Sequence, residues 1–385
     1  MKQTINDLIE QALSTLRKQG IVPEQATSDY RVEYTKDKQH GDFATNVALV
    51  LSKIAKMSSR DLARHVVDAI PASPIIESIE IAGPGFINIT LVDNAQHGVI
   101  KTILDNGKHF GRSDYGHHSS INLEFVSANP TGPLHVGHGR AAAYGDICAN
   151  LLNAIGYHVH REYYVNDAGR QMDILATSIW LRYLGLCDGT DLFPSNGYQG
   201  RYVVDIAESL HTERGEDFYH PIHAVYENIP ADESEGGDKE RHIDALISRA
   251  QMLLGKSNYD CIHEKGLNLI LNDIREDLSE FGVVFDEWFH ESTLYKEGIV
   301  QRCIDQLEAK NLTYKKEGHL WFKATAFGDE KDRVLVRENG TPTYFCADIA
   351  NHVRKLAHHA NHLIDIFGSD HHGYVPRMKA SLAAL

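Results

Sequence analysis

The stretch from Asn129 to Arg140, of sequence NPTGPLHVGHGR, constrains the fold more than any other part of the chain. It follows the apolar run Ile121 to Val126 and precedes an alanine-rich segment with helical patterning. Two prolines stiffen the turn between them, because the pyrrolidine ring restricts φ. The pattern therefore predicts a strand over 121–127, a turn, and a helix that begins near His135.

Two histidines, His135 and His138, lie on the first turn of that expected helix, and their spacing points both side chains the same way. Their ring N–H groups would add to free backbone donors and to the positive end of the helix dipole, which suits phosphate oxygens. Gly137 leaves a floor without a side chain, against which a flat base could lie. A zinc pair is the alternative, but zinc needs further ligands and no H-E-x-x-H or cysteine pair is nearby. The first hypothesis is a nucleotide site.

The fold class that we expect is α/β, with a Rossmann-like doubly wound parallel sheet preceded by an α+β domain. A chain of 385 residues is expected to hold two or three domains. Mixed helical and alternating patterns predict the α+β domain over residues 1–115. Over residues 116–385, the strand 121–127, the helix 138–155 and the strand 158–165 form a βαβ unit of the right size for a parallel sheet.

The second half of the chain has a less regular region, which we interpret as an insertion at about 186–290. Within it, residues 231–238 resemble a solvated loop. Parallel-sheet character is expected to resume with strands and one helix at 320–323, 334–337, 344–357 and 363–367. A last helix starts at Met378 and is cut off, so we expect a catalytic domain that is truncated at its C-terminus.

Charge and cysteine content restrict the class of protein. The net charge of −15 argues against indiscriminate nucleic-acid binding but allows a large RNA on a local basic face. Five dispersed cysteines without a C-x-x-C pair indicate reduced thiols. No apolar run reaches the length of a membrane helix, and the N-terminus lacks the apolar core of a signal peptide, so we expect a cytoplasmic protein. We also expect no structural metal.

Several stretches together resemble the arginyl-tRNA synthetases of class I. The run from Glu124 to His138 is similar to the first signature motif as that family carries it, and it is more specific than H-x-G-H alone. Further similarity lies in Gly41–Asn46, Gly83–Asn88, Tyr164–Gln171 and Asp332–Ala350. Lys56-Met57-Ser58-Ser59 resembles the second signature, but it precedes the first, and we interpret it as a helix junction capped by serine. The true second signature and the anticodon-binding domain are expected beyond residue 385.

The resemblance implies the roles of individual residues. Tyr344 and Asp348 lie four apart on an expected helix, and with Glu124 they match the positions that hold the substrate guanidinium in this family. Without the resemblance, a buried tyrosine and a surface aspartate would be the simpler interpretation. The implied arginine-binding residues are Glu124, Asn129, His135, Tyr344, Asp348 and His371, with His372 as an alternative to His371. The implied ATP-binding residues are His135, Gly137, His138, Gly368 and Asp370, and the implied catalytic residues are His135 and His138.

The resemblance also implies the reaction and the partners. Arginine and ATP with Mg²⁺ would form arginyl-adenylate and pyrophosphate, and the arginyl group would then pass to the terminal adenosine of tRNA(Arg). The N-terminal domain resembles the module that contacts the tRNA corner where the D-loop lies, and we expect a monomer. Two alternatives are a free-standing H-x-G-H nucleotidyltransferase and an inactive tRNA-binding paralogue.

Overall fold

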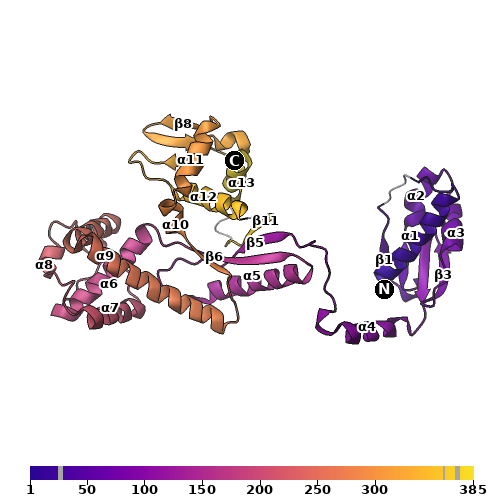
Figure 1. Cartoon of the computed structure of the whole chain (residues 1–385), viewed down its shortest axis with the longest axis horizontal. Helices are drawn as coiled ribbons and strands as arrows, with labels where there is room; N and C mark the ends of the chain where they lie inside the picture. The colour runs from indigo at the N-terminus through magenta and orange to yellow at the C-terminus, as the bar shows by residue number, and fades with distance from the viewer. Residues whose placement is uncertain (25–28, 359, 369–372) are drawn as a thin grey trace. The chain divides into compact units, whose positions relative to one another are not determined.

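The computed structural model describes residues 1–24, 29–358, 360–368 and 373–385 (Figure 1). These residues form two compact units, Met1–Gly111 and Arg112–Leu385. Each unit has its own hydrophobic core.

The first unit is an α+β fold around a four-stranded antiparallel sheet in the order β1-β2-β4-β3. Its main elements are α1 (Lys2–Lys18), β1 (Val32–Tyr34), β2 (Phe43–Thr45), α2 (Val47–Ala55), α3 (Ser59–Ala69), β3 (Ile76–Ala82), β4 (Phe86–Leu91) and α4 (Gly98–Asn106). Apolar residues at helical spacing on α1, among them Ile5, Ile9 and Leu13, are fully buried in its core.

The helical patterning of residues 44–55 predicts a single helix, and the structure corrects this expectation. Phe43–Thr45 form β2, which pairs with β1 on one side and with β4 on the other. The helix α2 begins only at Val47. Pairing with distant strands decides this segment, and local helical patterning cannot show such pairing.

The Lys56-Met57-Ser58-Ser59 segment is a helix junction, as expected. Lys56 adopts the left-handed conformation with φ of 54° at the end of α2. Ser58 caps α3, because its Oγ accepts a hydrogen bond of 3.1 Å from the backbone N–H of Asp61.

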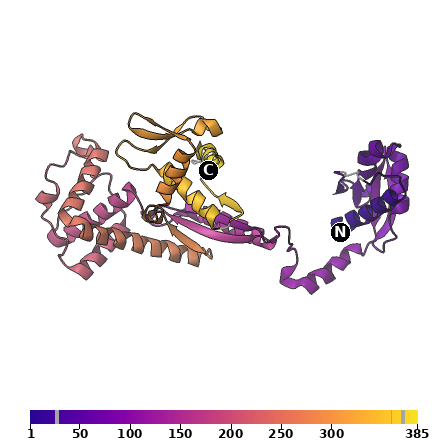
Figure 2. The same cartoon turned by 45° about the horizontal axis from the view of Figure 1, so that its top comes forward.

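The second unit contains a four-stranded parallel sheet in the order β11-β5-β6-β7, which confirms the expected α/β class. Its main elements are β5 (Ser120–Glu124), α5 (Val136–Ala154), β6 (His158–Val165), α6 (Arg170–Asp188), α7 (Arg201–Arg214), α8 (Ile222–Val225), α9 (Lys239–Glu280), β7 (Glu287–His290), α10 (Glu291–Lys296), α11 (Ile299–Ala309), β8 (Thr313–Lys316), β9 (His319–Phe322), β10 (Arg333–Val336), α12 (Tyr344–Ala357), β11 (His362–Asp365) and α13 (Val375–Ala384). Figure 2 shows the magenta strands of this sheet beside the yellow helix α12.

Two strand assignments from the sequence need correction. The strands near 320–323 and 334–337 exist, but as β9 and β10 they join β8 in a separate antiparallel sheet in the order β10-β9-β8. Residues 287–290, at the end of the expected insertion, form β7 and pair in parallel with β6. Strand direction and sheet membership depend on non-local hydrogen bonds, which periodicity does not encode.

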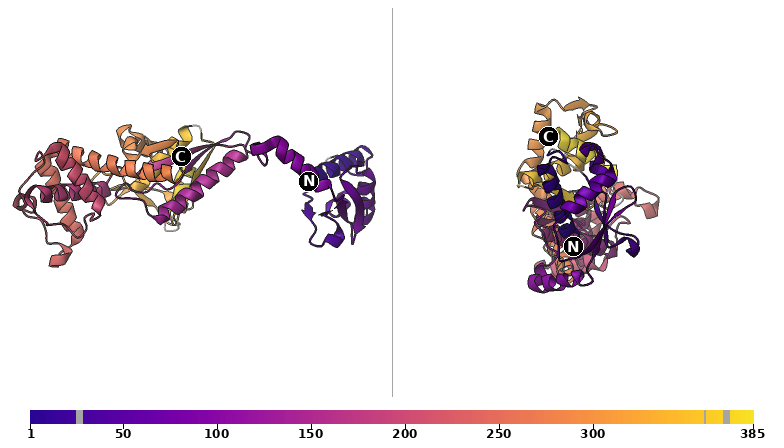
Figure 3. Two further views of the ribbon diagram at one scale, coloured as in Figure 1. Left: turned by 90° about the horizontal axis from the view of Figure 1, so that it is seen from below. Right: turned by 90° about the vertical axis from the view of Figure 1, so that its right-hand side faces the viewer.

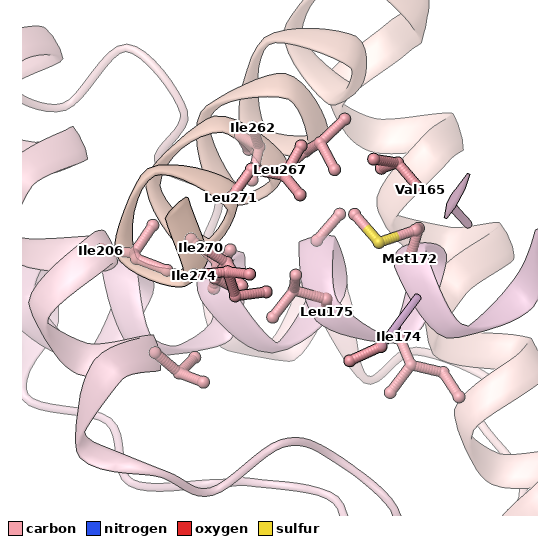
Figure 4. Packing of buried hydrophobic residues seen from close by; sticks show 14 of the residues in the cluster. Val165, Met172, Ile174, Leu175, Ile206, Ile262, Leu267, Ile270, Leu271 and Ile274 are labelled. Atoms are coloured by element: carbon pink, nitrogen blue, oxygen red, sulfur yellow. The ribbon is translucent and has the colours of Figure 1, made fainter. Parts of the chain in front are cut away.

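The region between α6 and β7 is mostly helical. The element α9 consists of two helices that meet at a kink at Gly255. Its second helix packs against α6, as Figure 3 shows within the whole chain and Figure 4 shows in a close view. Trp180 and Tyr183 of α6 are fully buried. The segment 231–238 is not a wholly solvated loop, because Asp232 is buried and accepts hydrogen bonds from the backbone N–H and Oγ of Ser195.

Candidate functional site

A cavity of about 400 Å³ lies at the carboxyl ends of the parallel strands, where doubly wound sheets bind ligands. Each strand supplies part of its wall, either from its own last residues or from the residues that follow it. Its lining residues include Glu124 at the end of β5, Asn129 after β5, Asn166 after β6, Glu291 after β7, Gly368 after β11, and Tyr344 and Asp348 from α12. The structure therefore brings together Glu124, Asn129, Tyr344, Asp348 and Gly368 from the set expected from the sequence.

The cavity has an acidic wall made by residues that are remote in the sequence. Burial raises the pKa of Glu291 to about 7, and the nearby carboxylates of Asp348 and Asp167 act in the same direction. Burial also raises the pKa of Asp348, although Tyr374 donates a hydrogen bond that opposes the shift. Two carboxylates that are poorly solvated and close to each other favour a cationic ligand between them.

Glu291 is the residue of this wall that we did not anticipate from the sequence. It lies at the first position of α10, directly after β7, and only 3% of its surface is exposed. With its amide oriented as hydrogen bonding favours, Asn166 donates to the Oε2 of Glu291 at 2.9 Å. The only sequence signal for Glu291 was its place after a short apolar-aromatic segment that proved to be a strand of the sheet.

Asp167 fixes the segment that carries Glu291. Its carboxylate accepts hydrogen bonds of 2.8 and 2.9 Å from the backbone N–H and Oγ of Ser292, and its other contact is the Nδ1 of His290 at 2.9 Å. These bonds lower the pKa of Asp167 against the opposing effect of burial. The loop after β6 thereby holds the start of α10 at the cavity.

The turn after β5 is strained. Val126 and Ser127 have φ of 66° and 40°, a left-handed conformation that costs on the order of 1–3 kcal/mol for each non-glycine residue. Neighbours hold it in place: the backbone N–H of Tyr164 donates to Ser127 Oγ at 3.0 Å, and Phe125 is fully buried. The strain ends β5 at Glu124, earlier than the sequence predicted, and turns the following residues into the cavity wall.

The histidine pair lies at the start of α5, as expected, and its rings stack at 3.7 Å between centroids. His135 is the N-cap residue, and its Nδ1 accepts from the backbone N–H of Gly137 at 3.1 Å. The Nδ1 of His138 accepts from the backbone N–H of His135 at 3.3 Å. Because each Nδ1 accepts, the proton of a neutral ring resides on Nε2, the nitrogen that can donate to a ligand. Burial, with a smaller contribution from His135, lowers the pKa of His138.

Asp370, His371 and His372, which we expected near the nucleotide or the substrate, lie outside the described residues.

Within the described part of the chain, His160, Glu162 and Glu287 are close enough to share a cation. The guanidinium of Arg354, however, already donates to Glu162 at 2.5 Å and to Glu287 at 3.1 Å. No helix among the described residues is long and apolar enough to cross a membrane.

Family models match both parts of the chain. The arginyl tRNA synthetase N terminal domain matches residues 3–91, and the catalytic domain of the class I (R) tRNA synthetases matches residues 99–183 and 230–382, more than half of the chain. The chain belongs to the arginyl-tRNA synthetase family. This confirms the resemblance seen in the sequence, and the unmatched residues 184–229 fall largely within the expected insertion.

Individual members of the arginyl-tRNA synthetase family support the assignment. An arginine–tRNA ligase of Thioalkalivibrio sulfidiphilus is 54% identical over 386 residues, covering 100% of this chain and 66% of the relative. One from Legionella pneumophila is 52% identical over 385 residues and is covered to 65%. The chain thus spans slightly less than two thirds of these relatives. The Thermus thermophilus arginyl-tRNA synthetase structure shares the fold, with a TM-score of 0.66, 20% identity, and coverage of 100% of this chain and 63% of that one.

Proposed function

We propose that the chain carries the amino-acid activating site of an arginine–tRNA ligase. In the first step, a carboxylate oxygen of L-arginine attacks the α-phosphorus of ATP. The bond to the bridging oxygen breaks, and arginyl-adenylate and pyrophosphate form. In the second step, the 2′-hydroxyl of the terminal adenosine of tRNA(Arg) attacks the arginyl carbonyl carbon. AMP leaves, and the hydroxyl proton is released.

The acidic cavity is the observation that carries this proposal. A guanidinium is planar and has five N–H donors, which carboxylates satisfy in fork-like pairs. Asp348 and Glu291, with the Tyr344 hydroxyl, supply acceptors at one cavity, and Glu124 adds a third acidic side chain. Lysine offers a point charge with three donors and leaves part of such a wall unsatisfied, so it is rejected.

Asn129 is assigned to the α-amino or carboxylate end of the amino acid, because it follows Glu124 on the signature turn and lines the same cavity. His135 and His138 are assigned to the ATP phosphates, since the N-terminus of α5 and both Nε2–H groups are donors. Gly137 admits the adenine ring. Gly368, Asp370 and His371 keep the nucleotide and substrate roles proposed for them, and Mg²⁺ enters with ATP.

Rate acceleration follows from alignment and charge stabilisation without a covalent nucleophile. The cavity fixes the arginine carboxylate beside the nucleotide, and the two Nε2–H donors stabilise negative charge that develops on the phosphate oxygens.

For the N-terminal unit we propose contact with tRNA(Arg) at the corner that contains the D-loop. A cavity of about 640 Å³ in this unit is lined by the cationic side chains of Arg31 and Lys36 and by the amide of Asn88. Tyr34 and Phe86 line the same cavity and are 69% and 41% exposed. Exposed aromatic rings beside cations and amides suit an unstacked base and its phosphate.

The decisive experiment is ATP–pyrophosphate exchange with L-arginine or L-lysine, with and without tRNA(Arg). Exchange that depends on arginine supports the proposal, and exchange that responds equally to lysine contradicts it. A free-standing nucleotidyltransferase would instead use a non-arginine acceptor, and an inactive paralogue would bind tRNA without any exchange. That the chain acts as a cytoplasmic monomer stays a prediction.

A further inference from the structure

Four acidic residues form a row across the parallel sheet, one on each strand. In strand order they are Asp365, Glu124, Glu162 and Glu287, and each is the direct register partner of the next. Register partners on neighbouring parallel strands point to the same face of the sheet. Like charges directly opposite each other are destabilising, so this carboxylate row needs cations from another element.

Helix α12 supplies those cations from residues 352–355. Arg354 binds Glu162 and Glu287, as described above, and its guanidinium lies 3.6 Å from the ring centroid of Phe289. His352 directs its Nδ1 to the carbonyl oxygen of Asp348 and its Nε2 to Asp365, each at 2.8 Å. Burial alone would lower the pKa of His352, but the hydrogen bond and the charge of Asp365, with the hydrogen bond to the Asp348 carbonyl, together raise it.

Lys355 is the cation that serves Glu124. Its side chain is fully buried, and its Nζ lies 2.5 Å from Glu124, 2.8 Å from Asp365 and 3.9 Å from Glu162. Burial opposes the ammonium charge, but the carboxylates of Glu124 and Asp365 outweigh it and raise the pKa of Lys355. A lysine at this position is therefore a permanent internal counter-ion.

Within the described part of the chain, Glu124 is the member of the row that also lines the substrate cavity. Its side chain is 12% exposed, so one carboxylate contacts both the buried ammonium and the cavity. Asp365 and Glu162 flank it on both sides in the sheet and would otherwise repel its negative charge. Lys355 therefore acts on Glu124, at the place where the row of carboxylates adjoins the substrate cavity.

We propose that Lys355 is a positioning residue for amino-acid recognition, which holds the side chain of Glu124 directed at the substrate cavity. It does not touch the amino acid itself, and it acts through Glu124. The inference rests on the proposed function, because it takes arginine as the ligand of the cavity. It assigns a substrate-directed role to a residue buried beneath the site.

The test measures the Kd of L-arginine and of ATP by titration calorimetry in a double-mutant cycle of E124Q and K355M. K355M is expected to weaken arginine binding by roughly 10- to 100-fold, the range of coupling between contacting charged groups. ATP binding should stay within about twofold, since Lys355 does not reach the histidine side. K355R keeps a cation near Glu124 and should restore most of the arginine affinity.

The matched control is K323M, which removes a lysine of the same unit whose Nζ donates only to the carbonyl oxygen of Asn311 in the described structure. If K355M affects arginine binding no more than K323M does, or affects ATP equally, the positioning role is refuted while the proposed function stands. If the unaltered chain binds lysine as well as it binds arginine, the proposed function fails, and this inference fails with it.

K355M leaves buried carboxylates without their cation and can therefore unfold the chain. In that case E124Q and E124Q/K355M are compared, because the doubly altered protein lacks both members of the pair. Equal arginine Kd values support action through Glu124. A further tenfold loss in the double variant would show that Lys355 acts independently and would overturn the inference.

Discussion

Glu291 makes arginine affinity depend on pH in a direction that the structure determines. Its pKa of about 7 means that the carboxyl is mostly neutral below this pH. A neutral carboxyl gives up the charge-assisted hydrogen bonds to a guanidinium. Arginine affinity should therefore fall as the pH decreases through 7. Burial also raises the pKa of Asp348, so the loss of arginine affinity becomes larger at the acidic end of the pH range.

The magnitude follows from the ionised fraction of one carboxyl. If only the ionised form binds, arginine binding at pH 6 is about tenfold weaker than at pH 8, or about 1.4 kcal/mol. Titration calorimetry at pH 6, 7 and 8 with L-arginine measures this ratio. In buffers of different ionisation enthalpy, the same experiment shows proton release on binding near pH 7.

The variant E291Q should bind arginine weakly, and its ratio of affinities between pH 8 and pH 6 should fall well below tenfold. E276Q, at an exposed position of α9, is the matched control and should keep the full dependence. A tenfold ratio that persists in E291Q, or a flat profile in the unaltered chain, would refute the assignment of Glu291 to the guanidinium.

The raised pKa of Glu291 makes the stability of the folded chain depend on pH in the opposite direction to arginine affinity. Because the folded pKa of Glu291 lies above its ordinary value of 4.5, the protonated carboxyl favours the folded state. This contribution is fully present below about pH 4.5 and is lost as the pH rises through about 7, for a total of about 3 kcal/mol. The unfolding free energy of E291Q should accordingly vary less over this range. A residue that costs stability at neutral pH is typical of a functional site.

Three further outcomes are expected. G145A should lower the thermal midpoint by the equivalent of about 1–3 kcal/mol, because an added Cβ would lie 2.2 Å from the Phe125 ring; an unchanged midpoint in a thermal melt contradicts this packing. Y202F removes the 2.6 Å hydrogen bond to the Thr131 carbonyl and should cost about 0.5–1.5 kcal/mol in urea unfolding, and stability equal to the unaltered chain would argue against the contact. F86A should weaken tRNA(Arg) binding by about 1–3 kcal/mol in a filter-binding assay while arginine binding is unchanged.

Much of the local structure of this chain could be predicted from the sequence. The limits of β6 and α12 agree with the expected ranges to the residue, and the Ser58 cap lies where its pattern placed it. Caps and periodic apolar positions act over three or four residues, so short windows of sequence contain them. The motif that ends in His135 and His138 also indicates a nucleotide site from its own residues, without reference to any family.

The acidic wall of the cavity forms only in the tertiary structure, because Glu124, Glu291 and Asp348 are far apart in the sequence. Glu291 directly follows β7, a strand that the sequence pattern assigns to the insertion. Its pKa depends on burial and on the carboxylates of Asp167 and Asp348, which are more than fifty residues away on either side in the sequence. The antiparallel hairpin β9–β10 shows the same limit, because a strand pattern does not state which sheet the strand joins.

The family, the two domain types and the place of the signature turn after a strand can all be predicted from the order of the amino acids. The buried pairing of Glu124 with Lys355 and the alignment of four carboxylates at one level of the sheet arise only when the chain is folded. The physical reason is that register and burial arise from contacts between distant segments. Electrostatic interactions at a site depend on those distances far more than on residue type alone.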